Sequence, residues 1–249
     1  MVSENTNFFH TEGILLKRQP YKENSVLCRC LTKDFGIISI IASGVYKEKS
    51  SLTGILEPFS QVQMELYKTQ KTQIYTLRSA NIVKSYLYGV DYQNTLLVNA
   101  AGELLLQCEF LIGESIDFYE LLVDFLNYLT KSEYHYFLIF SRFVLKFFSL
   151  LGISIEMCCS NCMTKEFTYF YPQQDGFLCA NCYKPLQYKS LIQLKQETSY
   201  ALCNIYSLKQ TKEKTISQEI IDEIKNVFLI HLSNHYNKKF HLNSLSDYK

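Results

Sequence analysis

The chain has 249 residues, of which 47% are apolar, 20% are charged and 14% are aromatic. A chain of this length and composition can bury a hydrophobic core, which excludes an intrinsically disordered protein and a small domain that depends on disulfides. The net charge of +1 identifies no class of partner. The first 80 residues, however, contain 10 Lys and Arg against 7 Asp and Glu, whereas the remainder contains 15 against 17. This N-terminal surplus suits either a solvated surface or a nucleic-acid site.

The N-terminus does not have the pattern of a secretion signal. It contains Glu4 and lacks both a basic region and a long apolar region. No run approaches the roughly 20 uninterrupted apolar residues of a membrane span, because the stretch 137–151 is interrupted by Ser141, Arg142 and Lys146. We therefore expect a cytoplasmic protein that keeps its cysteines reduced and does not contact a membrane.

Between residues 9 and 84 the apolar residues occur in short runs rich in β-branched types, separated by turn-forming residues. Such runs are typical of strands. They are found at 13–16, 26–31, 36–41 and 62–66, and the segment 69–72 links two alternating stretches. Five short strands in about 75 residues predict a small closed β-barrel.

After residue 90 the apolar residues follow helical spacing instead. Helices are predicted over 92–111, 117–129, 134–151, 190–206 and 217–236. Gly152 indicates the end of the third of these helices. The sequence thus predicts an α+β chain with a barrel domain over residues 1–82 and an all-α domain over residues 83–249, into which a cysteine module is inserted at about 156–188.

Two C-x-x-C pairs, Cys159 with Cys162 and Cys179 with Cys182, are separated by sixteen residues. This spacing is typical of a zinc ribbon or finger, because each pair can present two thiolates to one ion. Four thiolates complete a tetrahedral site and leave no position for a substrate, so we expect one structural Zn²⁺. Cys158 is an alternative to Cys159, which is preferred because its spacing matches the second pair.

The sequence contains none of the motifs that would indicate an enzyme. A phosphate-binding glycine loop, a nucleophile elbow and a His–carboxylate cluster are not recognisable. His231 and His235 have the i, i+4 spacing of a helix face but lie outside an H-E-x-x-H pattern, and we interpret them as surface or packing residues. We therefore expect a protein without catalytic activity.

An ordered series of short motifs spans nearly the whole chain. The first half contains Glu12–Arg18, Tyr21–Ser25, Leu31–Gly36, Ala42–Gly44 and Leu56–Phe59. The second half contains Arg142–Phe143, Leu150–Gly152, the paired cysteines, His231–His235 and Leu242–Leu245. This series resembles the RecO family of recombination mediators. The chain departs from the family pattern at Glu57, where glutamine is frequent, and at Val45–Tyr46, where a more basic dipeptide is common, and the second change is expected to weaken DNA contacts.

The resemblance implies an N-terminal OB-fold, followed by a helical domain that carries the zinc module. The implied function is to bind single- and double-stranded DNA, to anneal complementary strands coated with single-strand binding protein, and to assist RecR in loading RecA. The implied location is the cytoplasm, in association with the nucleoid. A zinc-ribbon scaffold that binds only proteins is the alternative function.

A barrel that binds single strands needs cations for the phosphates and aromatic faces for the bases. The candidate phosphate contacts are Lys17, Arg18, Lys22, Arg29, Lys33, Lys47 and Lys49, and the candidate stacking residues are Tyr21, Phe35 and Tyr46. Arg142 and Lys146, at helical spacing beside Phe143 and Phe147, are candidate contacts for the acidic C-terminal tail of single-strand binding protein. The same phenylalanine stripe is also typical of a helix core.

Overall fold

The computed structural model describes residues 7–47, 50, 52, 54–68, 72–88, 90–108, 112–131, 135–184, 191–206 and 216–248. Contacts divide the chain into two compact units, Met1–Thr130 and Lys131–Lys249. Each unit is described by itself. The predicted domain boundary at residues 82/83 lies within the last strand of the first unit's sheet, and it stays a prediction.

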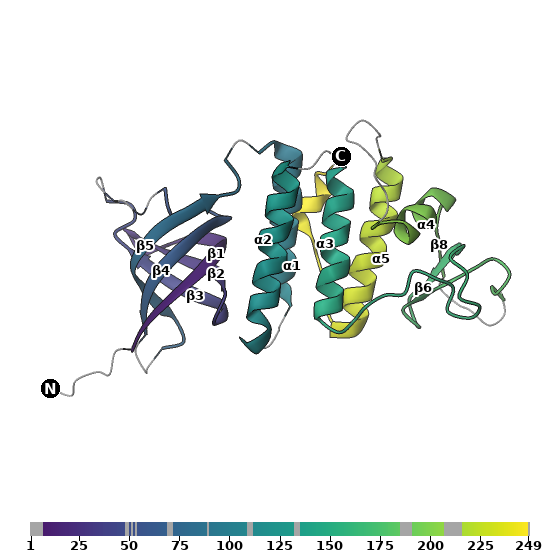
Figure 1. The fold of residues 1–249 in the computed structure, drawn as a ribbon, viewed down its shortest axis with the longest axis horizontal. Coiled ribbons are helices and arrows are strands. Elements are labelled where there is room, and N and C mark those ends of the chain that lie inside the picture. The colour runs from purple at the N-terminus through teal and green to yellow at the C-terminus, as the bar shows by residue number, and fades with distance from the viewer. Residues whose placement is uncertain are drawn as a thin grey trace. The chain divides into compact units, whose positions relative to one another are not determined.

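The first unit begins with five strands that form a closed barrel in the order β1-β2-β3-β5-β4 (Figure 1). The barrel closes because β1 pairs with both β2 and β4. Neighbouring strands are antiparallel except for a short parallel contact between β3 and β5. The strands are β1 (Asn7–Tyr21), β2 (Ser25–Thr32), β3 (Gly36–Ser43), β4 (Ser60–Lys68) and β5 (Tyr75–Ser85). The prediction of a β-rich N-terminal part is confirmed.

Strand β1 is longer than its apolar run indicates. The polar residues Gln19, Pro20 and Tyr21 have the composition of a turn, yet they pair with Leu27, Val26 and Ser25 of β2. They continue the strand because pairing with β2 satisfies their backbone, while Gln19, Pro20 and Tyr21 are themselves exposed on the barrel surface. The predicted apolar run at 13–16 therefore ends before the strand does, because composition alone does not show that residues 19–21 pair with β2.

The barrel core follows from the alternation of side chains along each strand. In β3, residues at every second position are buried, including Ile38, Ile40 and Ala42. Leu15, Val26, Val62 and Leu66 join the same cluster from the other strands. Phe9, Phe35 and Tyr75 pack against this cluster, with ring centroids 5.5 Å apart for both contacts of Phe9. The interior is thus filled by side chains and leaves the outer surface for function.

Two helices, α1 (Tyr92–Gln107) and α2 (Ser115–Lys131), complete the first unit, and a short 3₁₀ turn, η1 (Ile112–Glu114), precedes α2. The carboxylate of Asp91 accepts a hydrogen bond from the backbone N–H of Asn94 and caps α1. Helix α1 contacts β1 and approaches Phe59 closely at Gly102. A Cβ atom at Gly102 would lie 2.9 Å from Cζ of Phe59, so a larger residue at this position requires the Phe59 ring to shift.

A buried polar network joins the barrel to α2. The carboxylate of Glu12 in β1 accepts hydrogen bonds from Tyr119 Oη (2.7 Å) and Gln61 Nε2 (2.9 Å), and Lys33 Nζ lies 3.0 Å from it. Burial alone would raise the pKa of Glu12, but the hydrogen bonds from Tyr119, Gln61 and Lys33 together lower it to about 2. Burial and the Glu12 carboxylate raise the pKa of Tyr119 above its ordinary value. Glu12 is therefore ionised in the folded protein throughout the neutral range.

The depressed pKa of Glu12 makes the stability of the first unit depend on pH. An unfolded glutamate titrates near 4.5, so the contribution of Glu12 is fully present above that pH and is lost as the pH falls towards 2. We predict that Glu12→Gln lowers the free energy of unfolding by about 2 kcal/mol at pH 7. In denaturant titrations, the difference between wild type and Glu12→Gln should shrink between about pH 5 and about pH 3. A difference that stays constant over this range would contradict the role assigned to the carboxylate.

The close contact at Gly102 gives a second prediction. Gly102→Ala should destabilise the first unit by about 1 to 2 kcal/mol in chemical unfolding, because overpacking against Phe59 outweighs the helix propensity of alanine. The matched control is Gly113→Ala, since nothing lies within 4 Å of a Cβ atom there. Equal stability of the two variants would show that Phe59 relaxes without cost.

The second unit contains helices around a small sheet. Its elements are α3 (Tyr136–Leu150), β6 (Tyr169–Tyr171), β7 (Gly176–Leu178), β8 (Ile192–Gln193), α4 (Gln196–Cys203), α5 (Gln218–Tyr236) and the 3₁₀ turn η2 (Asn243–Ser246). The strands form a three-stranded sheet in the order β7-β6-β8. The helix predicted over 190–206 begins only at Gln196, because Ile192 and Gln193 pair with β6. Among the described residues, no helix has the length and apolar character needed to cross a membrane.

Candidate nucleic-acid interface and metal centre

Two predicted phosphate contacts, Lys17 and Arg29, lie directly opposite each other on β1 and β2. Both side chains are exposed, and within the described part of the chain neither forms an ion pair. Like charges at directly opposite positions destabilise an antiparallel pair. A strand pair that keeps two such cations side by side on its outer surface is suited to an anion with repeated charges, such as a phosphate backbone.

The next predicted contacts gather near one end of the same two strands. Tyr21 and Lys22 lie at the β1–β2 turn, and Tyr46 and Lys47 follow β3. The segment after β3 is held beside the turn by a 2.9 Å hydrogen bond from the backbone N–H of Val45 to the carbonyl of Asn24. Tyr21 and Tyr46 are 36% and 45% exposed, so part of each ring is open to solvent. This end of the barrel therefore presents two cations and two aromatic rings together.

Arg18 has a different role from its neighbour Lys17. Its guanidinium forms an ion pair with Glu57, donates to the carbonyl of Leu56 (3.3 Å), and lies 5.5 Å from the centre of the Tyr46 ring. Burial lowers the pKa of Arg18, but the hydrogen bond to Tyr46 and the charge of Glu57 outweigh it and raise the pKa. The side chain is only 13% exposed. Arg18 thus orients Tyr46, and Glu57 provides the carboxylate that holds Arg18.

Two of the predicted residues lie elsewhere on the barrel. Lys33 and Phe35 are in the β2–β3 turn, at the other end of β2 from Lys22. Lys33 binds Glu12 and lies 5.2 Å from the centre of the Tyr119 ring, and Phe35 packs edge-on against Phe9. Both side chains are therefore engaged in the fold, and the structure does not bring them to the cationic end. Lys49 lies outside the described residues.

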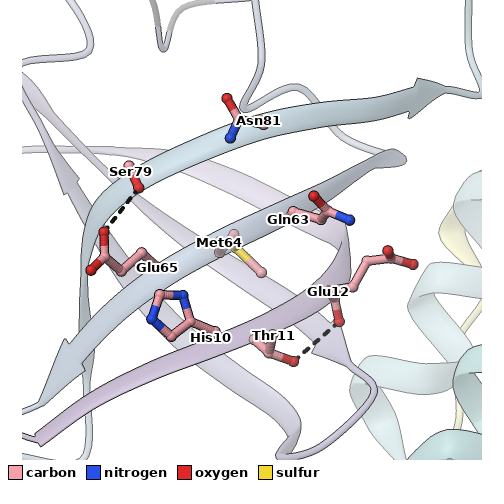
Figure 2. Close-up of a pocket in the computed structure, with 8 residues that line it drawn as sticks. All are labelled: His10, Thr11, Glu12, Gln63, Met64, Glu65, Ser79 and Asn81. Carbon is pink, nitrogen blue, oxygen red and sulfur yellow. Dashed lines mark hydrogen bonds between the residues drawn. The ribbon is translucent and has the colours of Figure 1, made fainter.

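A shallow hollow lies on another face of the barrel, across β1, β4 and β5 (Figure 2). Its lining residues are His10, Thr11, Glu12, Gln63, Met64, Glu65, Ser79 and Asn81. Two of them are carboxylates, and Ser79 donates a hydrogen bond to Glu65 (3.3 Å). Glu12 pairs with Lys33 and Glu65 pairs with Arg78, so among the described residues the hollow offers a polyanion no surplus of positive charge. The surface of β1 and β2, and not this hollow, is the candidate nucleic-acid interface.

The second unit brings the four predicted ligand sulfurs together. The Sγ atoms of Cys159, Cys162, Cys179 and Cys182 all lie within 4.8 Å of one another, and those of Cys162 and Cys179 are 3.7 Å apart. A tetrahedral site with metal–sulfur distances of about 2.3 Å requires sulfur atoms about 3.8 Å apart, so this donor set fits one Zn²⁺-sized ion. Cys158 is not in this group, and its sulfur faces Met163 at 3.8 Å.

The local backbone explains this convergence. The N–H of Met163 donates to the carbonyl of Cys159 (2.8 Å), and the N–H of Cys182 donates to that of Cys179 (3.2 Å), so each pair lies in a tight turn. The first turn is held beside β7 by a bridge between Cys159 and Phe177 and by a 2.8 Å hydrogen bond from the N–H of Ser160 to the carbonyl of Phe177, and the second turn follows directly after β7. Gly176, a residue type typical of turns, is the first residue of β7.

The thiols of the cluster influence one another's ionisation. Burial raises the pKa of Cys159, but hydrogen bonds from the backbone N–H groups of Cys179, Asn161 and Cys162 outweigh it and lower the pKa to about 6. The neighbouring sulfurs of Cys179 and Cys162 raise the pKa of Cys182 to about 12. Four sulfurs at one point therefore need a cation before all of them lose their protons.

The two residues predicted to bind a partner tail lie on α3. Arg142 donates from Nε to the carbonyl of Ile205 (2.6 Å), and Lys146 is exposed one turn later. The neighbouring Phe143 and Phe147 are buried, so they belong to the core and offer no open apolar groove. The partner role of Arg142 and Lys146 stays a prediction.

Sequence reasoning missed one polar residue of the second unit. Asp175, in the turn between β6 and β7, lies beside His231 and His235 of α5. The interpretation of His231 as a packing residue agrees with its burial. The dipeptide Asp175–Gly176 signals a turn, but no pattern along the chain indicates that this turn meets α5.

Comparison with known proteins agrees with these observations. A family model described as Recombination protein O N terminal matches residues 7–86, and a second, Recombination protein O C terminal, matches residues 90–244. The chain belongs to the RecO family. The resemblance predicted from the motif series is therefore confirmed.

Several relatives are similar along most of the RecO-family chain. The DNA repair protein RecO of Clostridium novyi (strain NT) is 26% identical over 249 residues, which cover 94% of this chain and 91% of the relative. That of Bacillus pumilus (strain SAFR-032) is 26% identical over 87% of this chain and 85% of the relative. That of Rubrobacter xylanophilus is 30% identical over 70% of this chain and 71% of the relative.

The adjacent cysteines provide a matched pair for testing the metal centre. We predict that Cys159→Ser abolishes tight metal binding at the cluster, because serine supplies no thiolate. Cys158→Ser should keep it, since the Cys158 sulfur lies outside the cluster. The measurement is the number of metal ions retained per chain after mild chelation, with about one expected for the wild type and for Cys158→Ser. Loss of the ion from Cys158→Ser, with retention in Cys159→Ser, would reverse the assignment.

Proposed function

We propose that this RecO-family chain is a recombination mediator in DNA repair that acts without catalysing a reaction. It binds single- and double-stranded DNA through the surface of β1 and β2, anneals complementary strands coated with single-strand binding protein, and assists RecR in loading RecA. The observation that carries the proposal is the opposed pair Lys17 and Arg29, with Lys22 and Lys47 near one end of the same strands. Family membership supplies the biological setting.

The strand order supports an OB-fold assignment for the barrel. OB-folds are five-stranded barrels that bind oligonucleotides on the face of their second and third strands and on the loop between strands one and two. Arg29 lies on β2, and Tyr21 and Lys22 lie at the β1–β2 turn. The positions of Lys22 and Arg29 thus correspond to the part of an OB-fold that meets nucleic acid, which supports the proposal.

Binding of DNA to this surface is expected to be independent of the base sequence. Lysine and arginine contact phosphates that every strand carries, and tyrosine rings stack on any base at about 1 to 3 kcal/mol each. Annealing requires two strands to be held close together with their charges screened, and it needs no general acid or base. The surface described for β1 and β2 supplies these requirements.

We assign Zn²⁺ to the cysteine cluster, with Cys159, Cys162, Cys179 and Cys182 as ligands and a structural role. All four positions of a tetrahedral ion are taken by thiolates, so no position remains for a substrate. The ion would join the two turns of the module, whose short strands bury little apolar surface. We also propose contacts with RecR and with the acidic tail of single-strand binding protein, the tail being bound by Arg142 and Lys146. The proposed location is the nucleoid in the cytoplasm.

The double charge reversal Lys17→Glu with Arg29→Glu tests the DNA-binding surface. Each lost phosphate contact on a single strand lowers the salt dependence of log K by about 0.7, so the slope should fall by about 1.4. Annealing of complementary oligonucleotides coated with single-strand binding protein should slow in parallel. Fluorescence anisotropy at several salt concentrations and a fluorescence annealing assay measure the two effects.

The control is Lys165→Glu with Lys239→Glu, two exposed lysines of the second unit whose reversal changes the net charge equally. It should bind and anneal like the wild type. Equal losses in both double variants would point to overall charge and contradict a localised surface. A wild type that neither binds nor anneals DNA would instead favour the zinc-ribbon scaffold that binds only proteins.

A further inference from the structure

A second cluster of metal-ligating side chains lies in the second unit, apart from the four cysteines. His231 and His235 are one turn apart on α5, and Asp175 approaches them from the β6–β7 turn. Asp175 Oδ2 lies 2.9 Å from His231 Nδ1 and 2.8 Å from His235 Nε2. One ligand atom from each residue thus lies within 4.8 Å of the other two.

The surroundings of His231 fix which ring nitrogen carries its proton. Its Nε2 lies 2.5 Å from the carbonyl oxygen of Ile153, and a carbonyl can only accept a hydrogen bond. Nε2 must therefore be the protonated nitrogen, so the Nδ1 of a neutral ring presents a lone pair. A histidine that donates one N–H to a carbonyl and turns the other nitrogen inward has the arrangement typical of a metal ligand.

This lone pair faces the Asp175 carboxylate in a buried place. His231 is 1% exposed, and its Nδ1 has no hydrogen-bond partner of acceptable geometry among the described residues, although Oδ2 is close to it. A second proton on Nδ1 would therefore not point at the carboxylate. Two acceptor atoms at this separation repel each other unless a cation lies between them.

The carboxylate of Asp175 has unused binding capacity as well. Its Oδ1 is buried and has no hydrogen-bond partner in the described part of the chain. The turn that carries Asp175 is held in place by a 2.6 Å hydrogen bond from Asn234 Nδ2 to the carbonyl of Pro172. The residue itself adopts a left-handed conformation, with φ of 54°. The turn is thus constrained to present this carboxylate to α5.

We propose that Asp175, His231 and His235 bind a second divalent transition-metal ion of the class of Zn²⁺, Co²⁺ or Ni²⁺. Two imidazoles and one carboxylate suit these ions, whereas Mg²⁺ and Ca²⁺ prefer oxygen ligands alone. The ion binds the His231 Nδ1 lone pair and the Asp175 carboxylate together, which removes their repulsion. It joins the β6–β7 turn to α5, while the cysteine cluster lies at the other end of β7.

Metal titration of the full-length, untagged protein tests the proposal. The protein is first washed with a mild chelator that leaves the cysteine cluster loaded, and Zn²⁺ is then added in competition with a chromophoric chelator. The wild type should take up about one further equivalent. His235→Ala and Asp175→Asn should each abolish this uptake. Asn is chosen because it tolerates the left-handed backbone at position 175 and removes only the charge and one oxygen.

The matched control is His241→Ala, an exposed histidine of the same unit outside the cluster. It should keep the further equivalent. With Co²⁺, the absorption spectrum should show weak visible bands without the sulfur-to-metal charge transfer of a thiolate site. No further uptake by the wild type, an equal loss in His241→Ala, or a charge-transfer band from the added Co²⁺ would each overturn the proposal.

Discussion

Strand β1 is the constraint on which the first unit depends. Its first half pairs with β4 and its second half pairs with β2, so one continuous strand closes the barrel. The same strand directs Glu12 towards Tyr119 of α2 and Gln61 of β4, which both donate hydrogen bonds to its carboxylate. Further along, it places Lys17 on the outer surface. Closure of the barrel, attachment of α2 and the position of the cationic surface are thus linked through a single strand.

The barrel pairs some of its charges, such as Glu65 with Arg78, and leaves others unpaired among the described residues. Lys17 and Arg29 occupy β1 and β2, whereas Glu12 and Glu65 lie at the hollow across β1, β4 and β5. Lys33 is neutralised by Glu12, and Arg18 is neutralised by Glu57. Several cations of the basic N-terminal part therefore serve the fold itself. Lys17 and Arg29, which form no ion pair among the described residues, leave positive charge on the surface of β1 and β2, which favours the approach of a polyanion from that side.

The segment of the second unit that contains β6, β7 and β8 has a small hydrophobic core and two clusters of side chains that could bind metal. Its strands β6, β7 and β8 are two or three residues long, and they bury few large side chains, among them Phe170 and Phe177. The cysteine cluster lies where β7 ends, and the Asp175 cluster lies where β7 begins. Short strands gain little stability from pairing alone, and a metal ion bound at either cluster would add to the stability of this segment.

The sequence by itself determined the order of β and α elements, the four cysteines that come together in one cluster, and the family, because periodicity, C-x-x-C spacing and short motifs are local properties of the chain. It named Lys33 and Phe35 as candidate DNA contacts along with Lys17, and their roles stay predictions. The structure places both at the end of β2 opposite Lys22, because nearness in sequence does not place side chains on one surface. Only the tertiary structure decided that Glu57 forms an ion pair with Arg18, and that Asp175 lies beside His231, more than fifty residues away in the sequence. Such pairings depend on strand register and on the packing of distant elements, which no local pattern encodes.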